Sequence, residues 1–518
     1  MDVLIFLGLL IGIALLIVFW FLRQQSYWRR RGIPHSKPII LAVLTKKHIV
    51  QILRETYQQF KGTGPFCGFF LFATNTALVV DLELVKKILI KDFNYFSDRG
   101  LYTNAHDDPL SGNMFFAKVN RWKRLRTKLT PTFTSGKMKN MFHMVSAVGE
   151  RLAATLQTHI GNGDADGAGR VLHMCDLSGR FTTDTIGTCA FGLECNSLSA
   201  ETPEFVLITN SFIQQRRHNK IVEGLIFSFP RIARFLRMRI IPQPLHNFYI
   251  KLVEDTLEYR TKTKCRRNDF LDLLIDMMEH EDAAGNHVEG LSVNEIAAQT
   301  FIMFLAGFET SATTMSFALY LLAQHPEIQT RLRQDINKVL ASNNEQLTYQ
   351  CIKQMNYLKQ VICETLRMYP IVPNLMRRAQ SHYDTGDPKY YIEKDTIVII
   401  PTIAIHYDPQ YYPDPERFDP ARFTSEEMQR RPACTWLPFG EGPRNCIGMR
   451  FGKMQTSIGL IYLIRNFQFS VAPETVIPCP LTKVSCLVSP ENGIKLRVDR
   501  VDGALPIRRT WDYMKSDT

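Results

Sequence analysis

Hydrophobic and polar positions divide the chain into one long apolar run and a much longer stretch of mixed periodicity. Residues 3–22 contain no charged side chain, and about twenty apolar residues span a bilayer as a helix. Trp20 lies near the end of the run, and four arginines occur within residues 23–31. Aromatic residues followed by positive charge predict an uncleaved anchor whose following domain stays in the cytoplasm. The alternative, a cleaved secretory signal, would carry its positive charge before the run and a small-residue cleavage site after it.

Beyond the apolar run, most of the chain up to about residue 465 has helical periodicity. Residues 69–81 and 390–401 are rich in β-branched and aromatic side chains and predict short strands, the first segment as a hairpin. The longest predicted helix runs from Ser292 to about Gln324, because Ser292 and Glu295 form a capping box and Pro326 stops it. At about 1.5 Å per residue it is roughly 50 Å long, enough to cross a domain. The pattern therefore predicts a mainly α fold with small β-sheets.

Composition narrows the class of protein without identifying it. The chain has 518 residues, of which 45% are hydrophobic, and 62 Lys and Arg against 50 Asp and Glu give a net charge of +12. The apolar fraction excludes a disordered chain, and the modest Gly and Pro counts exclude collagen. The excess of positive charge favours nucleic acid, anionic lipid or an acidic protein surface as a partner. Eleven scattered cysteines without a C-x-x-C pair are unlike a disulfide framework.

The strongest chemical signal is a loop near the C-terminus. Residues 438–448 read PFGEGPRNCIG, so several Gly and Pro residues constrain the chain before Cys446. Backbone N–H groups in such a loop can face the sulfur, stabilise its thiolate and tune a metal bound to it. The pattern turns helical from Ile447, and the positive end of a helix dipole also favours a thiolate. Most lone buried cysteines are inert packing, but this loop predicts a thiolate ligand.

These residues resemble the signature of one family, the cytochrome P450 haem-thiolate monooxygenases. The F-x-x-G-x-R-x-C-x-G pattern is matched by Phe439, Gly442, Arg444, Cys446 and Gly448. The resemblance implies a cytochrome P450 fold, a helix-rich haem domain with small β-sheets, behind one transmembrane anchor helix. It also implies that Cys446 is the axial ligand of haem b, whose thiolate ligation pushes electron density toward O–O cleavage.

The longest predicted helix carries a second family pattern, A-G-x-[DE]-T, through Ala306, Gly307, Glu309 and Thr310. In isolation these residues read as a tolerated glycine and a solvent-facing acid. The resemblance instead implies that Ala306 and Gly307 lie beside the haem, with Gly307 leaving room for dioxygen. It also implies that Thr310 and Glu309 deliver protons during oxygen activation. The Thr310 hydroxyl is expected to donate to the Ala306 carbonyl and open a local groove in the helix.

A third pattern, E-x-x-R, occurs at Glu364 and Arg367. A spacing of three puts both side chains on one helix face, where they can pair. An ordinary exposed pair of this kind contributes only a few tenths of a kcal/mol. By resemblance this pair is buried and structural and is completed by Arg417 of the P-E-R-F segment. Its loss is then expected to impair folding and haem retention.

Cationic residues for the haem propionates form a fourth set. Burying carboxylates requires cationic partners. The resemblance assigns this role to Trp122 and Arg126 of a W-x-x-x-R pattern, to Arg444 and to Arg377. Arg99 is a weaker match, for which a solvated surface charge is the alternative. By the same resemblance, Phe439 of the cysteine loop contacts the haem.

The resemblance extends from the anchor to about residue 501. Phrases such as AGFETSATT at residues 306–314 look most like the insect microsomal branch associated with xenobiotic metabolism. It implies a signal anchor at residues 1–22, a basic, proline-containing linker at 23–38, one haem-thiolate catalytic domain at 39–502 and a tail of unknown role at 503–518. One large domain replaces the three that the chain length suggests at about 150 residues each.

The expected partners follow from the same resemblance. Because the chain shows no dinucleotide or flavin fingerprint, electrons are expected from NADPH through cytochrome P450 reductase, with cytochrome b5 as a further partner. The reductase is expected to dock on basic residues near Cys446, including Arg450 and Lys453, and nucleic acid drops out as a partner. The protein is expected at the endoplasmic reticulum membrane. The Arg-rich, apolar residues 227–241 are expected to make a second membrane contact, a buried amphipathic helix being the alternative.

The resemblance also implies which side chains line the substrate pocket: Phe115, Phe116, Val372 and Leu375, with the glycine of the long helix. Because these residues are apolar or aromatic, a lipophilic small molecule is expected. A plant toxin, an insecticide, a fatty acid and a hormone precursor all fit that description.

Two other functions stay open at this point. One is a haem-thiolate isomerase or dehydratase that needs no external electrons, and the other is a non-catalytic binder of haem or lipophiles. Both would be expected to have lost some of Glu309, Thr310, Glu364 or Arg367, which the chain retains.

Overall fold

The structure is a computed structural model that describes most of the chain. The described residues are 12, 19, 22–37, 47–72, 74–161, 169–200, 217–267, 269–278, 280–281, 287–288, 290–483, 486–501 and 503. The predicted anchor at residues 1–22 lies outside this set except for residues 12, 19 and 22. The tail at 503–518 lies outside it except for Gly503.

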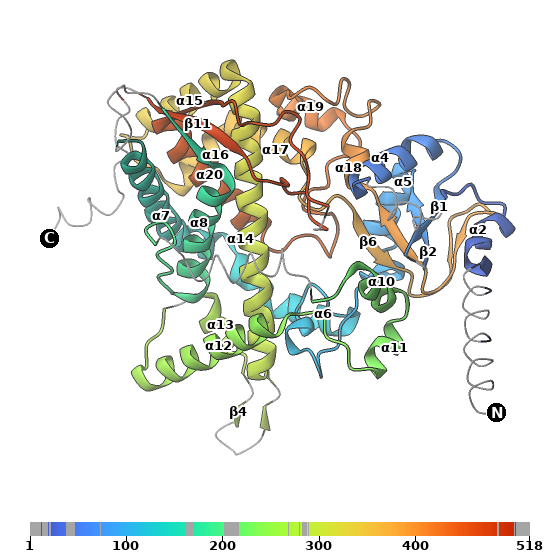
Figure 1. Cartoon of the computed structure of the whole chain (residues 1–518). Coiled ribbons are helices and arrows are strands. Elements are labelled where there is room, and N and C mark those ends of the chain that lie inside the picture. Colours follow the sequence, from blue (N-terminus) through green and yellow to red (C-terminus); the bar gives the residue numbers. More distant parts are fainter. Residues whose placement is uncertain are drawn as a thin grey trace, which may run out of the picture.

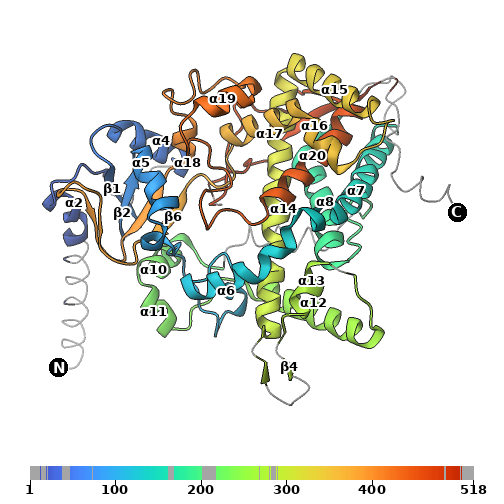
Figure 2. The same cartoon turned by 180° about the vertical axis from the view of Figure 1, so that it is seen from behind.

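Helix α14 (Val293–Gln324) runs through the middle of the molecule and organises the other elements around it (Figures 1 and 2). It begins at the predicted capping box: the Glu295 backbone N–H donates to Ser292 Oγ at 3.3 Å, and the Ser292 N–H donates to Glu295 Oε2 at 3.1 Å. It ends at His325, directly before Pro326. The prediction of this helix from its capping box and proline stop is confirmed.

Packing explains why a helix of this length is stable. Nearly every side chain from Ser311 to Ala323 is buried, and α14 contacts α8 (Met174–Ile186), α12 (Gln243–Thr263), α17 (Asn356–Met368) and α20 (Met449–Asn466). In the part of the chain that the structure describes, α14 is also the one helix long and apolar enough to cross a membrane. Since 61% of its most apolar window is buried inside the protein, it is a core helix.

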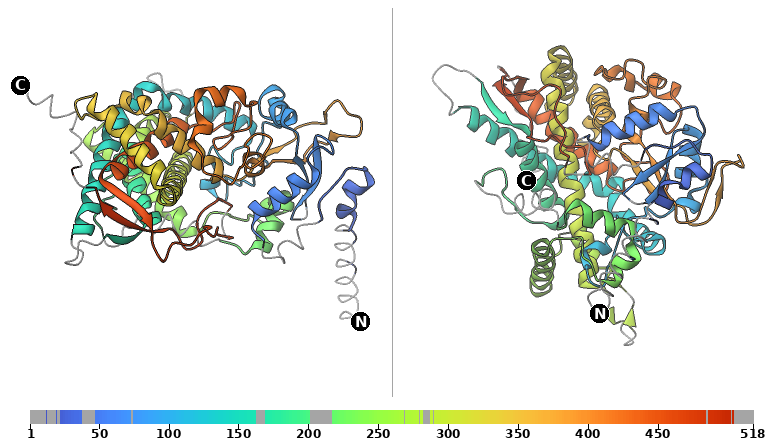
Figure 3. Two further views of the ribbon diagram at one scale, coloured as in Figure 1. Left: turned by 90° about the horizontal axis from the view of Figure 1, so that it is seen from above. Right: turned by 45° about the vertical axis from the view of Figure 1, so that its right-hand side comes forward.

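The remaining helices lie on both sides of α14, some against it and others grouped around the small sheets (Figures 1 and 3). The α-helices not yet given bounds are α2 (Tyr27–Arg30), α4 (Ile49–Phe60), α5 (Leu82–Lys86), α6 (Val119–Leu129), α7 (Ser135–Gly161), α10 (Lys220–Ser228), α11 (Pro230–Phe235), α13 (Phe270–Ile275), α15 (Pro326–Ala341), α16 (Tyr349–Gln354), α18 (Thr402–His406) and α19 (Ser425–Arg430). Shorter 3₁₀ and π turns are η1 (Lys87–Lys91), η2 (Phe93–Phe96), η3 (Pro109–Gly112), η4 (Thr130–Phe133), η5 (Gly187–Phe191) and η6 (Pro420–Phe423).

Small sheets complete the fold. A four-stranded sheet has the order β1–β2–β9–β6, with β1 (Phe66–Leu71) antiparallel to β2 (Thr74–Val79), and with β9 (Ile397–Ile400) parallel to β2 and antiparallel to β6 (Leu375–Arg378). A three-stranded sheet joins β10 (Phe467–Val471), β11 (Lys495–Arg500) and β3 (Arg170–His173). Two-stranded pairs are β4 (His280–Glu281) with β5 (His287–Val288) and β7 (Tyr383–Asp384) with β8 (Tyr391–Ile392). The hairpin at residues 69–81 and the strands at 390–401 are confirmed. The chain has the mainly α fold with small β-sheets that the sequence predicted.

Candidate functional site

The loop before α20 holds Cys446 in a constrained turn. The Cys446 N–H donates to the Phe439 carbonyl at 2.8 Å, and the Gly448 N–H donates to the sulfur. Gly442 has φ of +74°, and a Cβ there would lie 1.9 Å from the Leu89 carbonyl oxygen of η1, so only glycine fits. Helix α20 begins three residues after the cysteine, at Met449. The predicted loop, with a backbone donor facing the sulfur near a helix N-terminus, is confirmed.

Two observations describe the surroundings of the Cys446 thiol, and they differ at first sight. Its accessible surface places it among the exposed cysteines, whereas burial raises the pKa of its thiol. The thiol therefore has accessible surface although protein surrounds it on most sides. Arg99, Arg126 and the Gly448 N–H act against burial and lower the pKa of the thiol, so they favour the thiolate.

The middle of α14 shows the same combination of enclosure and accessible surface. Ala306 is exposed although its neighbours in the helix are buried or half-buried. The Thr310 hydroxyl donates to the Ala306 carbonyl at 2.6 Å, as expected from the sequence. The Gly307 carbonyl accepts from Gln455 Nε2 of α20 at 3.3 Å. Two carbonyl groups of α14 thus accept hydrogen bonds from side chains. The bond from Gln455 also joins α14 to α20.

Gly307 has a packing role that the sequence did not indicate. A Cβ at this position would lie 2.3 Å from Ile186 Cδ1 and 2.9 Å from its Cγ1. The missing side chain therefore makes room for Ile186 at the end of α8. The expectation that Gly307 leaves space for dioxygen stays a prediction.

Glu309 is enclosed between α14 and its neighbours. Burial raises the pKa of its carboxyl to about 7, while the hydrogen bond from Thr313 acts in the opposite direction. The Thr313 hydroxyl donates to Glu309 Oε1 at 3.4 Å. The carboxyl lies near enough to Cys175 of α8 to help raise the pKa of that thiol. Near neutral pH such a carboxyl exchanges a proton readily.

A cluster of buried guanidinium groups lies beside the cysteine loop. Arg444 is 2% exposed, stacks over the Trp122 ring at 4.8 Å, and donates to the carbonyls of Ser97 and Ala117. Burial lowers the pKa of Arg444 to about 10, and burial together with the charge of Arg444 lowers the pKa of Arg377 to about 10. The Nε atoms of both are buried without a hydrogen-bond partner.

Arg99 belongs to the same cluster and is not a solvated surface charge. Its Nη1 donates to the Phe115 carbonyl at 3.0 Å and its Nη2 to the Arg444 carbonyl at 3.2 Å. Burial and the charges of Arg444 and Arg377 hold the pKa of Arg99 well below its usual value. Arg99 is half-buried by its accessible surface, and its two hydrogen bonds favour membership of the cluster over the solvated surface charge that the sequence left open.

Arg126 supports the loop from the other side. Its Nη1 donates to the Asn445 carbonyl and its Nη2 to Asn445 Oδ1, both at 2.8 Å. Trp122, one turn earlier in α6, is buried and packs against Arg444 and Phe93. The W-x-x-x-R pattern thus clamps the residue next to Cys446.

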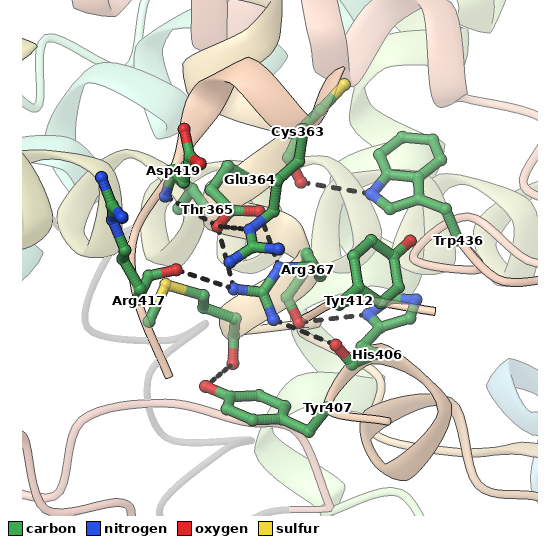
Figure 4. Close-up of polar contacts among 12 residues, drawn as sticks. Cys363, Glu364, Thr365, Arg367, His406, Tyr407, Tyr412, Arg417, Asp419 and Trp436 are labelled. Carbon is green, nitrogen blue, oxygen red and sulfur yellow. Dashed lines mark hydrogen bonds and ion pairs between the residues drawn. The ribbon is translucent and has the colours of Figure 1, made fainter. Parts of the chain in front are cut away.

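The E-x-x-R pair is fully buried in α17 (Figure 4). Arg367 Nε donates to Glu364 Oε2 at 2.7 Å and Arg367 Nη2 to Glu364 Oε1 at 2.9 Å. This bidentate geometry is the strong form of the interaction. The Asp419 N–H adds a further donor to Glu364 Oε1 at 2.9 Å.

The third member of this cluster is not the one predicted. Arg417 contributes only its backbone carbonyl, which accepts from Arg367 Nη2 at 3.3 Å, and its side chain is exposed. The second guanidinium near Glu364 belongs to Arg422, whose Nε lies 3.5 Å from Oε1. The prediction of Arg417 is therefore wrong for the side chain. Arg422 stands in Pro420-Ala421-Arg422-Phe423, a second P-x-R-F segment that offered the signal.

His406 links this cluster to the cysteine loop and was not predicted. Arg367 Nη1 donates to the His406 carbonyl at 3.0 Å, and the Leu437 N–H donates to His406 Nε2 at 2.8 Å. Nε2 is thus the acceptor, which assigns the proton to Nδ1, 3.1 Å from the Arg367 carbonyl. Burial, followed by the charge of Arg367, lowers the pKa of His406 to about 3, so the ring is neutral.

The residues predicted for the substrate pocket lie around these groups. Phe115 is 40% exposed and carries the Arg99 guanidinium 4.5 Å above its ring. Asn113 Oδ1 accepts from the N–H groups of Phe115 and Phe116. Val372 and Leu375 are half-buried, and a Cβ at Gly440 of the cysteine loop would lie 3.8 Å from Leu375.

The two cations predicted to receive the reductase differ in their surroundings. Arg450 is exposed in the first turn of α20. Lys453 is half-buried, and its ammonium lies 5.1 Å from the Trp436 ring and 5.3 Å from the Phe439 ring. Burial lowers the pKa of Lys453. The expectation that both receive the reductase stays a prediction, and exposure favours Arg450.

These residues fit haem b. None of Arg99, Arg126, Arg377 and Arg444 forms an ion pair with a carboxylate among the described residues, and two of them have unpartnered buried Nε atoms. A cluster of buried cations of this kind requires anions, which two propionates supply. Cys446 and Ala306 offer the accessible thiol and the small side chain that a flat ring needs.

Comparison with known proteins gives one consistent result. The family model described as cytochrome P450 matches residues 32–498. "Probable cytochrome P450 6a23" of Drosophila melanogaster is 50% identical over 94% of this chain and 97% of that protein. "Cytochrome P450 6A1" of Musca domestica is 43% identical over 96% of this chain and 97% of that protein. "Cytochrome P450 6a2" of Drosophila melanogaster is 45% identical over 97% of this chain and all of that protein.

Proposed function

Because the chain belongs to the cytochrome P450 family and is a haem-thiolate monooxygenase, we propose that it oxidises lipophilic xenobiotics, such as insecticides or plant toxins. Endogenous hormone or lipid metabolism is the other role that the same pocket chemistry supports. One observation carries the proposal: the Cys446 thiol has accessible surface, and guanidinium groups without a carboxylate partner among the described residues lie next to its loop. The helix that follows this loop, α20, packs against α14 at Gly307.

Haem b supplies oxygen activation when bound, and its electrons come from NADPH through a separate reductase. In the proposal, Cys446 holds the iron, and Arg99, Arg377 and Arg444 neutralise the propionates. Arg126 acts indirectly by fixing Asn445, the residue next to the cysteine. Three cations for two carboxylates offset the cost of burying the propionates.

Protons are the remaining requirement, since reduction of dioxygen consumes them. In the proposal Glu309 holds a proton, because burial raises the pKa of its carboxyl to about 7. Thr310 orients water through its hydroxyl, which its bond to the Ala306 carbonyl fixes. Glu309 and Thr310 lie on the turn of α14 that begins at Ala306, and Ala306 has accessible surface.

Substrate class follows from the proposed pocket, which Phe115, Phe116, Val372 and Leu375 line. The side chains named are aromatic or aliphatic, and such a pocket selects by shape and apolar surface rather than by charge. That selectivity suits a detoxifying enzyme with many substrates. The relatives' printed names do not state a substrate.

Reconstituted turnover tests this proposal. The full chain with haem, NADPH and cytochrome P450 reductase is offered a panel of insecticides, plant toxins, fatty acids and steroids, with product and NADPH consumption both measured. We expect products with one added oxygen from members of the first two groups. Oxidation of a single steroid or fatty acid alone would move the proposal to endogenous metabolism. Conversion without NADPH would contradict it.

Membrane attachment is the second part of the proposal. We propose an endoplasmic reticulum anchor at residues 1–22 and a second contact through α10 and α11. The exposed apolar residues of these two helices include Phe235, at 85% exposure, Ile221 and Ile232. Arg231 and Arg237 are exposed beside them. Exposed apolar residues interleaved with arginine suit the headgroup layer of a membrane.

Vesicle binding separates the two contacts. The full chain should stay with membranes after an alkaline carbonate wash, because of the anchor. A chain lacking residues 1–22 should still bind anionic vesicles, and Phe235→Ser should weaken that binding severalfold, at about 1–2 kcal/mol for the lost apolar side chain. If the truncated chain stayed wholly soluble with anionic vesicles, the second contact would be refuted while the anchor remained.

A further inference from the structure

A recess of about 360 Å³ lies where α2 meets β8, away from the Cys446 site. Its lining carries no residue of the haem site. Six lining residues matter for its chemistry: Arg23, Tyr27, Arg30, Arg31, Tyr391 and Glu393.

Helix α2 is fixed to the catalytic domain, so the recess is built rather than accidental. Trp28 is fully buried, and its Nε1 donates to the Phe69 carbonyl at 3.3 Å. A Cβ at Gly68 would lie 2.3 Å from the Trp28 ring, so this strand residue must be glycine for the ring to lie there. The tryptophan therefore locks α2 onto β1.

Arg31 is held rigidly at the wall of the recess. Its guanidinium lies 3.9 Å from the Tyr391 ring centre, and its Nη2 donates to the Tyr391 carbonyl at 2.5 Å. Its Nη1 donates to Tyr27 Oη at 2.7 Å, and the Tyr27 hydroxyl in turn donates to Glu393 Oε2 at 2.8 Å. Arg31 Nε is buried without a partner. A guanidinium fixed in this way presents a preorganised positive charge at the wall of the recess.

The charges of the recess do not balance. Arg23, Arg30 and Arg31 against Glu393 give 3 − 1 = +2. Arg30 is exposed, and its Nη2 donates only to the Arg23 carbonyl at 3.1 Å. No carboxylate of the described residues forms an ion pair with any of the three arginines, so the recess has an affinity for an anion.

Position identifies the anion. Arg23 directly follows the charge-free run of residues 3–22, and cations just after an anchor lie at headgroup depth. We propose that this recess binds the phosphate of an anionic glycerophospholipid from the surrounding membrane. The inference rests on the proposed anchor, which brings the recess to the membrane surface. Its effect is to fix the orientation of the catalytic domain, because Trp28 locks α2 onto β1.

A soluble lipid tests the site without relying on the membrane. Dihexanoyl phosphatidylserine is titrated by calorimetry into the full haem-loaded chain in a neutral detergent. Dihexanoyl phosphatidylcholine and inorganic phosphate serve as comparisons. We expect the serine lipid to bind, and Arg30→Gln to weaken it roughly tenfold, the loss of one charge-assisted contact. Arg29→Gln is the matched control: Arg29 is exposed in the same helix but does not line the recess, so this variant should stay within about twofold.

Each other outcome overturns the inference. If R30Q and R29Q lost the same affinity for the serine lipid, binding would depend on overall charge and not on the recess. If the choline lipid bound as tightly as the serine lipid, the site would not distinguish an anionic from a zwitterionic headgroup. Inorganic phosphate binding as tightly, with the same loss in R30Q, would make the recess a free-phosphate site. The reduced CO spectrum of both variants should match wild type, which excludes misfolding. The proposed anchor is tested separately. If it were wrong, an alkaline carbonate wash would release the chain from membranes while the soluble lipid still bound.

Discussion

Glu309 lies in the middle of α14, where burial raises the pKa of its carboxyl to about 7. The protonated fraction of such an acid falls as pH rises through that value. If Glu309 supplies protons, product formed per NADPH should fall over the same range in the wild-type enzyme. Near neutrality the residue can both hold and release a proton, which general acid catalysis requires.

Replacing the carboxyl with an amide tests this role. Glu309→Gln should lower product per NADPH on the order of tenfold, since a positioned proton donor contributes about that much or more. The variant should also lose the inflection near pH 7, which coupled turnover across a pH series would show. Glu327→Gln removes an exposed carboxyl and should change neither. Persistence of the inflection in E309Q would assign it to another group.

Gly307 is explained by packing, because a Cβ there would meet Ile186 Cδ1 at 2.3 Å. Gly307→Ala in the wild-type background should destabilise the protein by about 1–3 kcal/mol of overpacking. Combined with Ile186→Ala, which removes both Cδ1 and Cγ1, the same change should become neutral or stabilising by up to about 1 kcal/mol of helix propensity. Loss of the thiolate-type CO spectrum on heating measures both. Equal effects of G307A in the two backgrounds would show that Ile186 is not the reason for the glycine.

At the scale of elements, η6 and α17 assemble one buried charge cluster. Glu364 receives Arg367 in bidentate form, the Asp419 N–H and, at 3.5 Å, Arg422. Removing one partner of a buried carboxylate leaves charge uncompensated, which is more costly than losing an exposed pair.

Two neighbouring arginines give a matched comparison. Arg422→Leu should destabilise the haem-loaded protein by about 1–3 kcal/mol, because it removes a cation 3.5 Å from a buried carboxylate. Arg417→Leu keeps the backbone carbonyl that Arg367 uses and loses only an exposed side chain, so it should lie within about 0.5 kcal/mol of wild type. Haem retention measured over a temperature series compares the two variants. If Arg417→Leu lost haem at a lower temperature than Arg422→Leu, the Arg417 side chain would belong to the cluster after all.

Elements with a local signature were predictable from the sequence, whereas the choice between Arg417 and Arg422 was not. The capping box of α14 and the Gly and Pro residues before Cys446 encode their geometry within a few residues. Arg417 and Arg422 stand in two P-x-R-F segments that look alike, and only the placement of η6 distinguishes them. His406 joins Arg367 and Leu437, which are 39 and 31 residues away in sequence, so no local pattern marks it.

For the molecule as a whole, the net charge of +12 separates into groups with different surroundings. Arg99, Arg377 and Arg444 lie inside, near the cysteine loop. Arg23, Arg30 and Arg31 line the recess beside α2. Arg450 is exposed near Cys446, whereas Lys453 faces two rings.

Ionic strength should reveal which of these charges meets the reductase. Exposed charges are largely screened beyond about 10 Å at 0.1 M salt, so the rate at limiting reductase should fall as salt rises. Arg450→Gln should lower the rate roughly threefold at low salt and flatten the salt dependence. Lys453→Gln should change that slope less than Arg450→Gln does, because Lys453 is half-buried and its ammonium lies near two aromatic rings. A common slope for wild type and R450Q would exclude Arg450 from the docking surface.

The reduced, CO-bound absorption spectrum tests the central claim, that Cys446 carries the haem iron as a thiolate. The wild-type chain should show the Soret band at the thiolate-shifted position. Cys486→Ser, which changes another exposed cysteine, should keep the band there. Cys446→Ser should lose the shifted band. A wild-type spectrum without the shift, or a shifted band that survives in C446S, would contradict the account.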